Sequence, residues 1–169
     1  MDNIHEILPI VDENGNIIGR TERGIAHSGT KILHPVVHLH VFSPEGHIYL
    51  QKRPCWKDVQ PGKWDTAVGG HIDYGESVDT ALKREVREEL GFTPACLESL
   101  GHYVFESNIE KELIYVYKTI YAGVIRPSNT ELGGGRFWTN EEIIANIGKN
   151  IFTQNFEHEF VKFFFGNKS

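Results

Sequence analysis

The chain has 169 residues, enough for one domain with its own hydrophobic core, and its formal net charge is −6. That charge argues against broad attraction to nucleic acid or to an anionic membrane surface, so we expect neither as a partner. Two cysteines without metal-finger spacing, and no stretch that reads as a signal peptide or a membrane span, fit a reduced cytoplasmic protein.

The first half of the chain is expected to consist mainly of strands. Alternating apolar residues between turn sequences predict strands at residues 8–11, 17–20, 36–42, 48–52 and 66–68. The first two form a hairpin within an N-terminal extension over residues 1–30, and residues 21–28 form a short helix or turn. A loop is expected over residues 54–64, and the last strand leads into the pair Gly69-Gly70.

The second half is predicted to return to the sheet and to end in helices. Strands are expected at residues 97–105, 113–124 and 136–138. Thr139 and Glu142 have the spacing of a capping box, which begins a short helix that ends near Ile147, and Thr153 begins a final helix. The residues of this last helix available to the core are Phe156, Phe160, Val161, Phe163 and Phe164. Strands around one long helix and a helical tail predict a single α/β (α+β) sandwich domain over residues 1–169.

The long helix lies between a plausible N-cap, Ser77, and a plausible terminal glycine, Gly91. Its apolar residues recur every four positions and form one buried face: Val78, Leu82, Val86 and Leu90. At about 100° per residue, Glu85 and Glu89 project into the middle of this face and Glu88 lies at its edge. Acidic side chains therefore stand where a helix is normally apolar.

Carboxylates at these positions need a compensating charge. Burying an unpaired carboxylate costs several kcal/mol, and three carboxylates at this spacing also repel one another. A divalent cation removes both costs, and oxygen-only ligands favour Mg²⁺ or Mn²⁺. An alternative is that Glu is simply a common helix former, but three acids beside an apolar face, after a glycine-rich loop, favour a metal site.

Residues 70–92 resemble the Nudix box, the signature of hydrolases that act on nucleoside diphosphates linked to another group. The pattern is matched at every specified position: Gly70, Glu76, Arg84, Glu85, Val86, Glu88, Glu89, Gly91 and Phe92. The resemblance implies a mixed sheet between helices and a pyrophosphohydrolase that cleaves a small-molecule diphosphate with Mg²⁺ or Mn²⁺.

The same resemblance assigns roles within the site. Metal would be held by Glu85, Glu88, Glu89 and the carbonyl of Gly70, while Arg84 holds the box carboxylates in place. Glu76 braces the junction between loop and helix. One of the box acids, or Glu131 in a later loop, would accept a proton from water. The cations beside the preceding loop that could bind phosphate are Lys52, Arg53 and Lys57.

Outside the box, roughly from residue 27 to 138, the chain resembles one Nudix branch, the type I isopentenyl diphosphate isomerases and related uncharacterised hydrolases. That isomerase holds a second metal with three His and two Glu. The positions that match these ligands here are His27, His34, His71, Glu110 and Glu112. Arg53 and Lys57 also match the isomerase's diphosphate-binding residues.

One departure separates the chain from the isomerase. Where the isomerase has a catalytic cysteine, this chain has Gly69, which carries no group able to move a proton. All the box acids are present, which favours hydrolysis. An isomerase-like enzyme and a nucleotide-binding module without turnover remain the alternatives.

Other features are open at this level. His38 and His40 share one strand face, where they could line the pocket, although polar partners on a partly covered face explain them better. The N-terminal hairpin, or the Phe-rich tail at residues 160–165, could bury surface in a homodimer or serve the core instead. The substrate is undetermined, because specificity would lie in loops such as residues 54–63 and 128–135.

Overall fold

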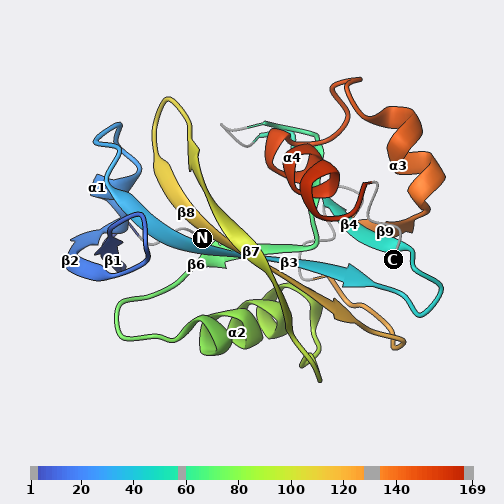
Figure 1. The fold of residues 1–169 in the computed structure, drawn as a ribbon, viewed down its shortest axis with the longest axis horizontal. Coiled ribbons are helices and arrows are strands. Elements are labelled where there is room, and N and C mark those ends of the chain that lie inside the picture. Colours follow the sequence, from blue (N-terminus) through green and yellow to red (C-terminus); the bar gives the residue numbers. More distant parts are fainter. Residues whose placement is uncertain (1–3, 57–59, 128–133, 166–169) are drawn as a thin grey trace.

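The computed structural model describes residues 4–56, 60–127 and 134–165. The chain begins with a two-stranded antiparallel sheet, β1 (Ile7–Val11) and β2 (Ile17–Glu22), followed by the short helix α1 (Arg23–Ala26). This hairpin is the one predicted from the turn sequence, and it lies at one end of the molecule (Figure 1). Within the described part of the chain, no helix has the length and apolar character needed to cross a bilayer.

The remaining strands form one seven-stranded mixed sheet. Its main path runs β5 (Trp64–Thr66), β4 (Ile48–Lys52), β3 (Leu33–Phe42), β8 (Lys111–Ile120) and β7 (Glu98–Glu106). Two further strands complete it: β6 (Val68–His71) pairs with β3, and β9 (Gly135–Trp138) pairs with β4. The pairing of β3 with β8 is parallel and all other pairs are antiparallel.

Helices cover both faces of this sheet, as Figure 1 shows. Helix α2 (Val78–Leu90) packs on one face, where its Leu82 and Val86 join Val37, Leu39 and Val41 of β3 in a buried cluster. Helices α3 (Asn140–Asn146) and α4 (Gln154–Phe163) belong to a second cluster on the other side, built on the β4 and β9 strands. The predicted mixed α/β sandwich is therefore confirmed.

Three local expectations were wrong. The strand expected over residues 113–124 is β8, which ends at Ile120. A single strand was expected at residues 66–68, but β5 and β6 are separate strands, and Gly69 and Gly70 lie inside β6 instead of after it. Val161 was expected in the core, yet it is 49% exposed. The reason is helical geometry, because α4 buries Phe156 and Phe160 on one face and position 161 falls outside that face. The capping box of Thr139 and Glu142 is present as predicted.

Candidate active site

Helix α2 forms where its local signals predict. The side chain of Ser77 accepts a hydrogen bond from the backbone N–H of Thr80, and Gly91 ends the helix in the left-handed conformation, at φ 76°. The face that packs on the sheet buries Ala81, Leu82, Val86 and Leu90. These contacts fix the rotation of the helix, so the direction in which its glutamates point is decided by the apolar residues between them.

Arg84 connects this helix to the loop before it. Its Nε and Nη2 each donate to Glu76 at 2.8 Å, its Nη1 donates to Glu85 Oε1 at 2.7 Å, and Nη2 also donates to the carbonyl of His71 at 3.1 Å. Hydrogen bonds from Arg84 hold the pKa of Glu76 below its ordinary value. A planar guanidinium can satisfy all these acceptors together, which a lysine could not do.

The three box glutamates differ in burial. The Glu88 side chain is 62% exposed, whereas Glu85 and Glu89 are largely covered. Burial, followed by the nearby charge of Glu85, raises the pKa of Glu89 to about 8. Glu89 Oε2 is buried without a hydrogen-bond partner among the described residues. Buried carboxylate oxygens that lack partners suit a divalent cation, which needs oxygen ligands and offsets the cost of burial.

The Glu85 carboxylate lies so close to the backbone at position 70 that only a glycine fits there. A Cβ at position 70 would lie 2.3 Å from Glu85 Cδ and 2.5 Å from its Oε1. No real side chain fits there, so the glycine lets the Glu85 carboxylate lie directly against the β6 backbone.

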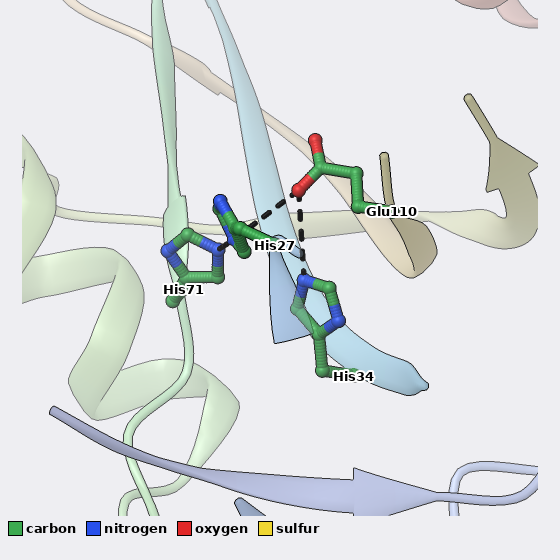
Figure 2. A group of neighbouring side chains, drawn as sticks. All are labelled: His27, His34, His71 and Glu110. Carbon is green, nitrogen blue, oxygen red and sulfur yellow. Dashed lines mark hydrogen bonds and ion pairs between the residues drawn. The ribbon is translucent and has the colours of Figure 1, made fainter. Parts of the chain in front are cut away.

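A second group of ionisable side chains converges from four separate segments (Figure 2). His27 Nε2 lies 2.9 Å from His71 Nε2 and 3.1 Å from Glu110 Oε2, while His34 Nε2 lies 3.9 Å from the same oxygen. One ligand atom from each of these four residues lies within 4.8 Å of the others, an arrangement able to hold a metal ion. Glu112 lies beside this group, with Oε2 4.0 Å from His34 Nε2.

The surroundings of His34 favour a metal ligand. Its Nδ1 lies 2.9 Å from the carbonyl of Ile32, which can only accept, so Nδ1 carries the proton. Burial lowers the pKa of His34 and, more strongly, that of His71, which keeps both rings neutral. His34 Nε2 is therefore a bare lone pair, buried with no hydrogen-bond partner in the described parts of the chain.

Of the three predicted phosphate-binding cations, the structure describes Lys52 and Arg53. Arg53 follows β4, and its Nη1 lies 3.4 Å from Asp65 Oδ2. Burial raises the pKa of Glu110, and the charge of Arg53 opposes part of that rise. Lys52 ends β4 and is partly buried. Lys57, like the candidate base Glu131, lies outside the described residues.

Strand β6 separates the two groups. In its register with β3, His71 lies opposite Val36, Gly70 opposite Val37 and Gly69 opposite His38. Side chains alternate across a sheet. Gly70 thus faces the box glutamates, whereas Gly69 and His71 face the side that carries the histidine group. The box glutamates and the histidine group therefore lie on opposite faces of the same short strand, β6.

Two residues near the site were not identified as functional from the sequence. Glu159 of α4 is fully buried and accepts hydrogen bonds at 2.6 Å from His38 Nδ1 and at 2.8 Å from His40 Nε2. Asp65 of β5 accepts from the Thr153 hydroxyl at 2.8 Å, beside Arg53. A signal did exist for Glu159, because it interrupts the apolar face between Phe156 and Phe160, as Glu85 and Glu89 interrupt that of α2.

Comparisons with known proteins identify relatives of this chain. The NUDIX domain matches residues 32–165. An uncharacterised Nudix hydrolase of Streptomyces coelicolor is 32% identical over 151 residues, covering 88% of this chain and 83% of its own. The isopentenyl-diphosphate Delta-isomerase of Streptomyces avermitilis is 30% identical over 156 residues, covering 89% and 79%. A crystal structure from Deinococcus radiodurans shares the fold, with a TM-score of 0.79 at 21% identity over 94% of this chain and 99% of that one.

Fold, box and relatives together define a hydrolase that acts on pyrophosphate bonds. The chain belongs to the Nudix family, as the resemblance of residues 70–92 predicted.

Proposed function

We propose that this protein is a divalent-metal-dependent pyrophosphohydrolase, using Mg²⁺ or Mn²⁺, that cleaves a nucleoside diphosphate linked to another moiety or a related organic diphosphate. The observation that carries this proposal is the pair of covered carboxylates, Glu85 and Glu89, with an unpartnered oxygen on Glu89. Glu88 completes the set from the exposed edge. The carbonyl of Gly70, on the same strand that Glu85 contacts, is the proposed fourth ligand.

The reaction is the attack of a water oxygen on one phosphorus. The bridging P–O bond breaks, its electron pair leaves on the second phosphate, and the water proton passes to a carboxylate. When bound, the metal would screen the diphosphate charge and lower the pKa of water. Arg84 positions Glu85 through the bond described above. The proton acceptor is one of the box acids or Glu131.

Two further elements would complete the site. The substrate phosphates are proposed to bind to Lys52, which ends β4, to Arg53, which follows it, and to Lys57. A cationic side chain and a phosphate oxygen form a strong charge-assisted hydrogen bond. His27, His34, His71 and Glu110, with Glu112 beside them, are proposed to hold a second metal ion. Mixed nitrogen and oxygen ligands suit Mn²⁺ or Zn²⁺ as well as Mg²⁺.

Product analysis on a panel of diphosphates tests the function. The panel contains nucleoside triphosphates, nucleotide sugars, ADP-ribose, NADH, coenzyme A and isopentenyl diphosphate, each with Mg²⁺ and with Mn²⁺. Cleavage that falls more than about 100-fold in Glu89→Gln, equivalent to ~2.7 kcal/mol of transition-state stabilisation, supports the proposal. Asp79 is an exposed carboxylate of the same helix, so Asp79→Asn is the matched control and should leave the rate of cleavage unchanged. Stabilisation by ligands without turnover of any would instead favour a binding module.

The histidine group and the similarity to a protein named as an isomerase favour a second candidate, allylic isomerisation of isopentenyl diphosphate. Gly69 argues against isomerisation, because it stands where the isomerase has a catalytic cysteine and carries no group that can move a proton. A Cβ there would make ordinary contacts, 3.4 Å from His38 Cδ2 and 3.6 Å from its Nε2, so the backbone would accept a cysteine. Double-bond migration by the unaltered protein, without phosphate release, would replace the hydrolase with this candidate. If only the Gly69→Cys variant isomerised isopentenyl diphosphate, the proposed hydrolase function of the unaltered protein would stand.

A further inference from the structure

Glu159 is the centre of a buried polar network that the proposed reaction does not use. Besides the two histidines, it accepts a hydrogen bond at 2.5 Å from the hydroxyl of Tyr103, which in turn accepts one from Asn155 at 3.3 Å. The residues come from β3, β7 and α4. A fully buried carboxylate with three donors has a defined orientation, and it fixes the rings bonded to it.

Of the two histidines, His38 is the one that borders the active site. It lies opposite Gly69 on β6, two residues along β3 from the pair Val36 and His71. Gly69 is exposed and has no side chain to cover the ring, and the His38 side chain is itself 12% exposed. Its Nε2 has no hydrogen-bond partner among the residues that the structure describes, although Nδ1 is held by Glu159.

The network needs a positive charge, because a buried carboxylate is costly unless a cation pairs with it. His40 is enclosed by Phe156 and Phe164, and its Nδ1 is buried without a partner in the described residues. His38 has an open second nitrogen. Burial by itself would lower the pKa of His38, but the charge and hydrogen bond of Glu159 raise it to about 9.

Two further carboxylates that act on His38 come from other strands of the sheet. Asp65 on β5 and Glu112 on β8 both act on it electrostatically. The Gly69 backbone is hydrogen-bonded to Glu89 of the Nudix box. The edge of the His38 ring lies against Gly69, since a Cβ at position 69 would be 3.4 Å from His38 Cδ2 and 3.6 Å from its Nε2. Gly69 is exposed, so a ligand bound between the box and the histidine group would lie close to His38 Nε2.

We propose that His38 is a substrate-binding residue, that its Nε2–H donates to a phosphate oxygen of the bound diphosphate, and that Glu159 is the residue that positions it. That the ligand is a diphosphate rests on the proposed function. That His38 Nε2 lies beside Gly69 rests on the register of β3 with β6. His38 thus supplies a rigid cation from the sheet, in addition to the cations of the loop after β4.

Nuclear magnetic resonance of protein with ¹⁵N-labelled imidazoles tests this directly. The probe is methylenediphosphonate with Mg²⁺, which contains two linked phosphorus groups and cannot be hydrolysed. The His38 resonance, assigned by its loss in His38→Asn, should shift on titration, and the His40 resonance should not. An unchanged His38 resonance when the protein is saturated with the probe overturns the proposal, and so does a probe that does not bind.

Variants provide an independent readout by calorimetric titration of the same probe. His38→Asn keeps an amide near Glu159 but lacks the distal donor, so affinity should fall about 10- to 100-fold, the range for a lost hydrogen bond to a charged group. His38→Gln, which can return a neutral donor to that place, should recover part of the loss. Glu159→Gln should weaken binding as His38→Asn does, and the double variant should be no weaker than either, because both changes remove one interaction.

The matched control is His40→Gln, which changes the other imidazole on the same carboxylate. It should lower the melting temperature and leave the affinity of the folded protein unchanged. Equal loss of affinity in His40→Gln and His38→Asn would mean that the network only supports the fold, and would overturn the proposal. Because these measurements need no turnover, a protein that binds the probe through His38 yet cleaves no diphosphate would refute the hydrolase alone.

Discussion

Gly70→Ala is the most stringent test of the geometry of the Nudix box. The added Cβ would lie 2.3 Å from Glu85 Cδ, whereas ordinary contacts begin near 3.4 Å, so the carboxylate must move by about 1 Å. That shift breaks the 2.7 Å bond from Arg84 Nη1 to Glu85. Overpacking together with a lost charged hydrogen bond should cost about 2–4 kcal/mol of stability. A 1 Å misplacement in an active site costs about 100-fold in rate.

The assays are kcat/KM for diphosphate cleavage, Mg²⁺ titration followed by calorimetry, and thermal unfolding by circular dichroism. The neighbouring Gly69→Ala is the control for folding and metal affinity, because its Cβ would be no closer than 3.4 Å to any neighbour. We expect Gly69→Ala to unfold and bind Mg²⁺ like the unaltered protein. If Gly70→Ala kept full activity and Mg²⁺ affinity, Glu85 would not be held against β6, and the metal site described above would be wrong.

Three further predictions follow from single contacts. Arg84→Lys loses the paired bonds to both oxygens of Glu76, so kcat/KM should fall about 10- to 100-fold, and an unchanged value would contradict a positioning role. His34→Gln should reduce the Mn²⁺ or Zn²⁺ bound in equilibrium dialysis by one equivalent. His102 is exposed and lies outside the group, so His102→Gln should leave the bound metal unchanged. Ser77→Ala should cost about 1 kcal/mol, or about 2–4 °C in Tm, and Ser77→Asp should not, because aspartate also caps.

Much of helix α2 could be predicted because its signals are local. The apolar spacing, Ser77 at the start and Gly91 at the end lie within one continuous segment, and the structure places the helix between them. The glutamates on the apolar face were informative for the same reason, since helical geometry alone decides which residues share a face. The same rule, applied to α4, would have singled out Glu159.

Strand boundaries near the site were harder to predict. Gly69 and Gly70 are poor strand formers and were expected to follow a strand, yet they pair with β3 inside β6. Pairing with a long neighbour overrides weak intrinsic preference, and the lack of side chains is what allows Glu85 to approach. A strand of this kind can be recognised only once its partner is known.

The sequence alone identified the Nudix family, because the residues that carry the resemblance are contiguous, and it placed three of their acids on one helix, because helical geometry fixes which residues share a face. Tertiary structure decided what lies around the motif. The pairing of β3 with β6 and β8 brings together His34, His71 and Glu110. The segment that carries His27 is joined to that of Glu110 by a hydrogen bond from Gly29 N–H to the carbonyl of Ile109, and His38 meets Glu159 across 121 positions of the chain. The family resemblance could name the histidine group, but that its side chains meet, and that His38 bonds to Glu159, depends on long-range packing, which no local pattern of residues encodes.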